Sequence, residues 1–272
     1  MRVVRKYGVA QVAPYVNWLY FYHAWQMGGK RRGEREELRA DAEGMLRHFD
    51  MHYHTKAVVA LFNAAAEGDD ILLEGGVRIP MLRQQTPEGN GECLCLADFV
   101  APATKGWSDK VAVFAATVDP MMENEPSDDP YYRMLAQTLA DRLAEATAER
   151  LHEEVRKHLW GYAPDERLSI EELHAEKFQG IRPAVGYPAM PDTSINFIID
   201  RLIDMGEVGI RLTENGAMRP HASVSGLMIA HPEARYFNLG KIGTDQLADY
   251  ARRRGMPLEM ARKFLATSIG NT

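Results

Sequence analysis

Residues 131–160 read YYRMLAQTLADRLAEATAERLHEEVRKHLW, and this stretch predicts one long helix. Apolar side chains recur at four-residue intervals, so they would form a ridge along one side of the helix. At a rise of about 1.5 Å per residue the helix would run ~45 Å, long enough to be the spine of the fold. The ridge consists of Leu135, Leu139, Leu143, Leu151, Val155 and Leu159.

Charged residues lie off the early part of this ridge. They include Arg142 and three acids spaced four residues apart, Glu145, Glu149 and Glu153. For any one of these acids, a solvated helix face is the ordinary interpretation.

Strand patterns lie on both sides of the long helix. Residues 111–118 are almost entirely apolar and predict a buried strand. Residues 71–74 and 77–79 flank the pair Gly75 and Gly76, which tolerates positive φ, and together they predict a hairpin. Further strands are expected at residues 208–212, 222–229 and 235–239.

Helical patterns alternate irregularly with these strands. Residues 34–63, rich in Glu, Arg, Leu and Ala, predict helix with a break near residues 50–55. Ser169 and Glu172 form a capping-box pattern at the start of a short helix, residues 169–177. Because no βαβ rhythm appears, the order of elements predicts an α+β fold. A loop is expected at 119–130, and more helices at 193–205, 244–254 and 258–265.

Composition limits the classes of function. The 272 residues carry a net charge of −6 and a pI near 5.9, which argues against nucleic-acid binding. No apolar run is long enough for a signal peptide or a membrane span, so we expect a cytoplasmic protein without membrane insertion. Cys93 and Cys95, the only cysteines, are too close for an ordinary disulfide and are expected to be buried or half-buried thiols.

The stretch GIRPAVGYPAM, residues 180–190, predicts a stiff and irregular loop. Pro183 and Pro188 fix their own φ and push the preceding residues toward extended geometry, so helix is disfavoured. Arg182 offers a planar fork that matches a carboxylate, and Gly186 allows a close approach. Two interpretations of the loop have about equal weight. It either grips a small zwitterion, or it carries an Arg that pairs with a local acid.

Familiar catalytic motifs are absent from the sequence. It contains no GxGxxG, no GxxxxGK[ST] and no HExxH, so nucleotide-fold and zincin functions lack support. His52 and His54 have no third ligand nearby, and we expect no metal site. Ser223 and Ser225, with His221, lack the GxSxG elbow and are interpreted as structural hydroxyls.

The chain carries several longer motifs: the loop 182–187, ADRLAE (140–145), WGYAP (160–164), LADFVAP (96–102), LTE (212–214), ASVSG (222–226), and residues 231–237 and 245–253. Together these motifs resemble the activation domain of cobalamin-dependent methionine synthase. They follow the family in collinear order over nearly the whole chain, residues 1–272, which implies a single domain. The resemblance also implies a bent, mainly antiparallel sheet flanked by helices, one of them long and central.

The resemblance implies a function. Domains of this family bind S-adenosylmethionine and restore methylcobalamin from inactive cob(II)alamin, using an electron from a flavodoxin-like donor. The chain begins at Met1 without homocysteine, folate or cobalamin domains, so the cobalamin is expected on a partner chain. The chain would then be a methyltransferase component that works by positioning, with no catalytic acid or base.

The family's binding residues can be transferred to this sequence where the motifs match. Arg182 resembles the residue that pairs with the ligand carboxylate. Aromatic faces and carboxylates suit a sulfonium and an ammonium group. The expected ligand-site residues are Asn17, Glu145, Glu176, Arg182, Ala184, Gly186, Tyr187, Tyr236 and Phe237.

One position departs from the family pattern. The family usually has an Asp before a Trp near the amino terminus, where it meets the ligand's ammonium group, and this chain has Asn17 before Trp18. Asn loses the charge-assisted part of that hydrogen bond, on the order of 1 kcal/mol. Two alternatives therefore stay open: a module that senses S-adenosylmethionine or docks to a corrinoid protein, and a reactivator of another corrinoid methyltransferase.

Overall fold

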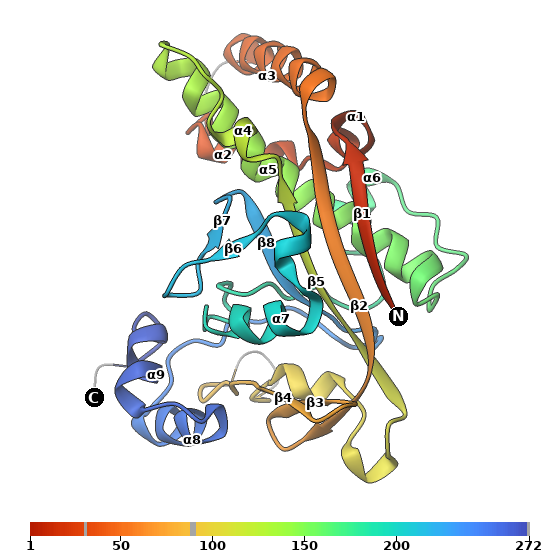
Figure 1. Cartoon of the computed structure of the whole chain (residues 1–272), viewed down its shortest axis with the longest axis vertical. Helices are drawn as coiled ribbons and strands as arrows, with labels where there is room; N and C mark the ends of the chain where they lie inside the picture. Colours follow the sequence, from red (N-terminus) through yellow and green to blue (C-terminus); the bar gives the residue numbers. More distant parts are fainter. Residues whose placement is uncertain (30–31, 88–90, 271–272) are drawn as a thin grey trace.

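The computed structural model describes residues 1–29, 32–87 and 91–270 and has an α+β fold built on a curled antiparallel sheet (Figure 1). Adjacent strands follow the order β4, β3, β2, β5, β8, and β1 pairs with β2 on the edge opposite β5. The predicted fold class is confirmed. The strands of this sheet are β1 (Arg2–Gly8), β2 (His54–Glu67), β3 (Asp70–Leu73), β4 (Val77–Pro80), β5 (Asp109–Val118) and β8 (Ser223–Met228).

The helices surround this sheet, with a long α5 at its centre (Figure 1). The carboxyl end of α5 continues into one turn of π-helix, η4 (Val155–Leu159). Short 3₁₀ turns and a two-stranded ribbon, β6 (Arg211–Leu212) with β7 (Met218–Arg219), complete the connections. The α-helices are α1 (Val9–Val12), α2 (Trp18–Ala24), α3 (Arg32–His52), α4 (Pro120–Glu123), α5 (Pro130–Glu154), α6 (Ile170–His174), α7 (Ile195–Ile203), α8 (Thr244–Arg254) and α9 (Leu258–Phe264).

Strand β2 is the axis of the sheet and corrects the sequence prediction. The helix expected at 34–63 ends at His52, and residues from His54 onward form a strand. An alanine-rich segment is compatible with either structure, and the tertiary context decides. β2 is hydrogen-bonded along both edges, by β1 and β5, and Ala57 to Ala60 are all buried. Its small side chains allow helices to approach the sheet closely.

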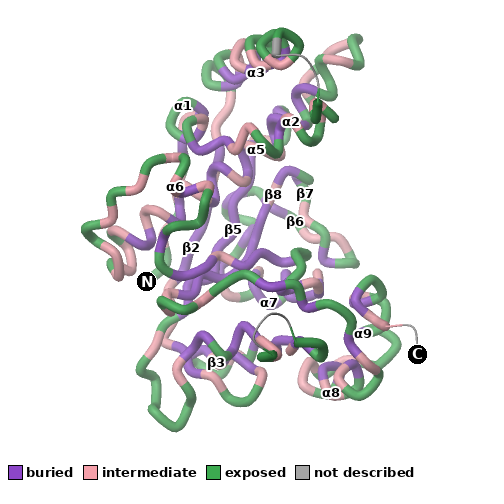
Figure 2. The backbone as a smooth tube through the Cα atoms, turned by 180° about the vertical axis from the view of Figure 1, so that it is seen from behind, coloured by how far each residue is buried: buried purple, intermediate pink, exposed green. Residues whose placement is uncertain are grey.

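The sheet separates two hydrophobic cores. Ala57 and Val59 of β2 and Phe114 of β5 pack with the Leu ridge of α5, while Val58 and Val113 face the opposite core with α7. Because successive side chains alternate between faces, a strand buried on both faces is apolar throughout. The burial of β2, β5 and β8 is visible in Figure 2, where the outer helices α3 and α9 carry much of the exposed surface.

The predicted spine is confirmed. Asp129 caps α5 by accepting a hydrogen bond from the backbone N–H of Tyr131, and Pro130 occupies the first turn. The ridge from Leu135 to Val155 is buried, and Leu159 packs against its edge. The capping box of Ser169 and Glu172 is also present at α6.

Other predictions have mixed outcomes. The hairpin at Gly75 and Gly76, the strands at 111–118 and 222–229, and the helices near 193–205, 244–254 and 258–265 are confirmed. Only Arg211–Leu212 of 208–212 is strand, and residues 235–239, which the structure describes, form none. The loop at 119–130 contains α4. Strand β1 was not anticipated.

A close backbone approach fixes the path of the 180–190 loop. Residues 181–185 run beside β8, where Leu227 N–H donates to the carbonyl of Pro183 and Val185 N–H donates to that of Ser225. A Cβ at Gly226 would lie 2.1 Å from the Pro183 carbonyl oxygen. Glycine is therefore required at position 226 for the loop to pair with β8.

We expect Gly226→Ala to lower the free energy of unfolding by at least about 2 kcal/mol, since the loop and β8 must separate. Gly44→Ala is the matched control. A Cβ there meets only the tip of Arg47, at 3.8 Å, so replacing a helical glycine should stabilise the protein by up to about 1 kcal/mol. Urea unfolding of both variants measures the difference. Equal stability of Gly226→Ala and the wild type would contradict the close packing.

Candidate functional site

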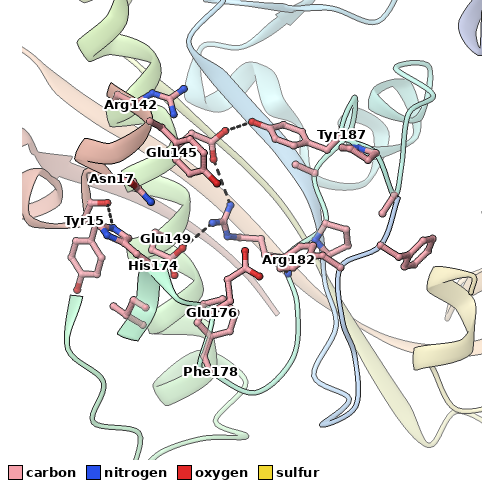
Figure 3. Close-up of a pocket in the computed structure, with 18 of the residues that line it drawn as sticks. Tyr15, Asn17, Arg142, Glu145, Glu149, His174, Glu176, Phe178, Arg182 and Tyr187 are labelled. Carbon is pink, nitrogen blue, oxygen red and sulfur yellow. Dashed lines mark hydrogen bonds and ion pairs between the residues drawn. The ribbon is translucent and has the colours of Figure 1, made fainter. Parts of the chain in front are cut away.

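A cleft of about 680 Å³ lies between α5 and the loop that carries Arg182 (Figure 3). α5 supplies Arg142, Glu145 and Glu149 to one wall. The other wall comes from the loop and from residues 236–238, while residues near α2 and α6 line the remaining sides. The volume is typical of a site for a small organic molecule.

Eight of the nine residues expected from the sequence lie in this cleft, although they come from four distant parts of the chain. Gly186 is not part of its lining. With φ +89° it shapes the turn beside the cleft, where its N–H donates to the carbonyl of Met190. The role of these residues in binding remains a prediction. The eight are Asn17, Glu145, Glu176, Arg182, Ala184, Tyr187, Tyr236 and Phe237.

Arg182 is the electrostatic centre of the cleft. Its Nη2 donates to Glu149 Oε2 at 3.0 Å, and its Nη1 lies 3.9 Å from Glu145 Oε2. Burial by itself lowers the pKa of Arg182, but Glu149 and the other acidic groups facing it raise the pKa above its ordinary value. The guanidinium therefore stays charged. Arg182 pairs with a local acid, as one of the two sequence interpretations anticipated.

Two tyrosines hold the Arg182 loop. The hydroxyl of Tyr187 donates to Glu145 Oε1 at 2.5 Å and spans the cleft from the loop to α5 (Figure 3). Burial, followed by the charge of Glu145, raises the pKa of Tyr187, so the phenol stays protonated. On the far side, Tyr236 accepts a hydrogen bond from the backbone N–H of Arg182 at 2.9 Å. The loop is thus bound at its tip and at its base.

Glu176 and Asn17 lie near Arg182 in different settings. Glu176 adopts φ +56°, and burial together with the charge of Glu149 raises the pKa of its carboxyl group. Asn17 caps α2, where its Oδ1 accepts a hydrogen bond from Leu19 N–H at 3.1 Å. The side-chain oxygen of Asn17 is therefore already engaged at a helix end.

Sequence reasoning missed Glu149. A solvated helix face was its expected setting, but its side chain is only 12% exposed and holds the Arg182 guanidinium. The available signal was the i, i+4 spacing from Glu145, which places both carboxylates on one face of the helix. Phe178 and His174 also line the cleft and were not anticipated.

Behind the cleft, His152 is fully buried on the same side of α5 as Glu149. Burial, and then the cations Arg156 and Arg182, lower its pKa well below the ordinary value of 6.5. Its Nε2 lies 3.4 Å from the Tyr162 hydroxyl. His152 is therefore neutral in the folded protein.

The fold and the cleft together define an α+β small-molecule-binding class of domain, in which a largely buried Arg on a glycine-shaped loop faces acids and aromatic rings. Residues 8–255 match the family described as vitamin B12 dependent methionine synthase, activation domain. The chain belongs to this family, and the resemblance stated from its motifs is confirmed.

A solved structure supports the same assignment. The crystal structure of the MetH reactivation domain bound to AdoHcy is 38% identical in sequence, with a TM-score of 0.94. The alignment covers 100% of this chain and 91% of that chain. Within the residues that the structure describes, no helix is both long and apolar enough to span a membrane.

We expect the stability to fall as the pH drops below about 6.5, because the unfolded chain then protonates His152 and the folded chain does not. Above about pH 6.5 this effect of His152 on the free energy of unfolding is absent. Below that pH, the free energy of unfolding falls by up to about 1.4 kcal/mol per pH unit. His152→Gln removes this titration. Urea unfolding at pH 7.5 and 5.5 should show that the free energy of unfolding decreases less for the variant than for the wild type. Parallel losses would contradict the assignment.

Proposed function

We propose that the chain binds S-adenosylmethionine in the Arg182 cleft and presents it to a cobalamin held by a separate methionine synthase chain. The observation that carries the proposal is the pairing of Arg182, whose side chain is only 11% exposed, with acids from α5 across a cleft of suitable size. Residues 1–272 would act as a single activation-like domain in the cytoplasm.

The charges in the cleft complement this ligand. S-adenosylmethionine carries a carboxylate, an ammonium and a sulfonium group. Arg182 matches the carboxylate, and Glu145, Glu149 and Glu176 offer negative charge to the two cationic groups. The rings of Tyr187, Tyr236 and Phe237 supply aromatic surface for the remainder of the ligand.

Unused hydrogen-bonding capacity supports the fit. Arg182 Nε and Glu149 Oε1 are buried and have no hydrogen-bond partner among the described residues. Such groups are costly unless they have a partner. A ligand with both a carboxylate and an ammonium group can satisfy a buried donor and a buried acceptor at once.

The residues of the chain would act by binding, orienting and shielding. Arg182 would hold the carboxylate, and the bond between Tyr187 and Glu145 would narrow the opening of the cleft and exclude water. When bound, S-adenosylmethionine would supply the methyl group and leave as S-adenosylhomocysteine, while one electron from a flavodoxin-like donor would reduce cob(II)alamin on the partner, so that methylcobalamin would form. No proton transfer is needed, so the proposal assigns no catalytic acid or base.

We expect removal of the Arg182 guanidinium to weaken S-adenosylmethionine binding roughly 100-fold, since two charge-assisted hydrogen bonds are lost. Arg182→Ala alone leaves Glu149 buried and unpaired, which destabilises the fold. The double variant Arg182→Met with Glu149→Gln avoids that charge. Titration calorimetry measures binding, and Arg201→Met, on the exposed surface of α7, is the matched control. Wild-type affinity in the folded double variant would sink the assignment.

Asn17→Asp should tighten binding of S-adenosylmethionine by roughly fivefold, because a charged acceptor replaces a neutral one opposite the ammonium group. Asp caps a helix about as well as Asn, so α2 should keep its stability. Calorimetry gives the affinity, and thermal unfolding provides the control. An unchanged affinity would place the ammonium group away from Asn17.

A reconstituted assay distinguishes reactivation of cobalamin from a function that only senses S-adenosylmethionine. The chain is mixed with a cob(II)alamin-loaded methionine synthase partner, a reductant and S-adenosylmethionine, and the methylcobalamin spectrum is followed. We expect the spectrum to appear with the wild type and to fail with the Arg182 and Glu149 double variant. Binding without this spectral change would favour the sensing or docking module.

A further inference from the structure

Phe178 forms part of the cleft at the end opposite Arg142 (Figure 3). Its side chain is otherwise enclosed, and the residue is only 8% exposed. The edge-on ring of His152 packs against it, with 4.9 Å between ring centroids. Phe178 follows the strained Glu176 by two residues and precedes Gly180, so its own segment is irregular backbone.

Arg156 lies behind this ring. Its guanidinium carbon is 4.3 Å from the centroid of Phe178, and its side chain is completely buried. Arg156 Nε donates to Glu166 Oε2 at 2.9 Å, and Nη2 donates to Oε1 at 2.8 Å. The pair is bidentate, which restricts the movement of the guanidinium over the ring.

The π-helical turn at the end of α5 places Arg156 there. Val155–Leu159 is wound as π-helix, and the carbonyl of Arg156 accepts a hydrogen bond from Ala163 N–H at 2.9 Å. This contact folds the segment that carries Glu166 back toward α5. Single π turns within or at the end of α-helices are frequently found at functional sites.

Stability alone gives a weak reason for this arrangement. A buried ion pair is often matched or exceeded by apolar residues of similar volume. Arg156 also lies near His152, and its charge disfavours protonation of that ring. Apolar residues would not reproduce a hydrogen-bonded guanidinium held over the Phe178 ring, 4.3 Å from its centroid, beside the cleft.

We propose that Arg156 is a positioning residue for the ligand. Paired with Glu166, it holds the Phe178 ring as a fixed apolar wall against which S-adenosylmethionine is placed. The inference rests on the proposed function. It also assigns Phe178 a specific role: because the Arg156 guanidinium lies over the ring and its charge would repel a second cation, the ring serves as apolar packing surface and not as a cation-binding face.

A double-mutant cycle on ligand affinity tests this inference. The pair variant combines Arg156→Met with Glu166→Gln, so no lone charge stays buried. Calorimetry with S-adenosylmethionine compares four proteins: wild type, pair variant, Phe178→Leu, and all three substitutions together. We expect the pair variant to bind about tenfold more weakly than the wild type, with almost no further loss in the Phe178→Leu background. Equal losses in both backgrounds would overturn the role assigned to Phe178.

A ligand-free measurement keeps this test separate from the proposed function. Carbon–proton NMR of the Phe rings, with Phe178 assigned through Phe178→Leu, should show a shifted and more mobile ring in the pair variant. If the pair variant folds poorly, Arg156→Lys takes its place in this measurement. It keeps the charge and loses the planar fork, so it should show the same change in the Phe178 signals. Unchanged Phe178 signals would overturn the positioning role. Failure of the wild type to bind S-adenosylmethionine would instead contradict the proposed function.

Discussion

The packing of α5 on the sheet is the interaction on which the rest of the structure depends. One side of α5 carries the Leu ridge that fills the core against β2 and β5. Another side carries Glu145 and Glu149, which face the Arg182 loop, and His152 is buried behind the cleft. Because a helix is rigid over several turns, the contact that builds the core also sets the depth and orientation of the acids in the cleft.

The cleft is a balance of buried charges held by backbone contacts. Arg182 can stay charged in a largely dry environment because Glu149 and Glu145 face it. Its position comes from the pairing of its loop with β8, which requires Gly226, and from Tyr236, which accepts its backbone N–H. In the function proposed above, a ligand would exchange partners with the acids without a movement of this loop's backbone.

Much of the fold followed from local patterns. The four-residue ridge of α5, the apolar run of β5 and the Gly75–Gly76 hairpin all report their own secondary structure, since period and turn chemistry are local properties. The segment after His54 did not, because its alanines suit a helix as well as a strand. Only hydrogen bonding to β1 and β5 made it a strand. The strand prediction for residues 235–239 was wrong for the opposite reason. Their pattern suits a strand, but in the structure they do not pair with a neighbouring strand.

The sequence by itself determined the α+β class, the family and the position of the Arg182 loop, because motifs, turn residues and periodicity are local properties of the chain. The tertiary structure alone decided which acid holds Arg182, that Asn17 caps α2, and that the Arg156 guanidinium lies over the Phe178 ring. Glu149 and Arg182 are separated by 33 residues, and pairing across such a distance depends on how α5 and β8 pack. No local pattern encodes that contact.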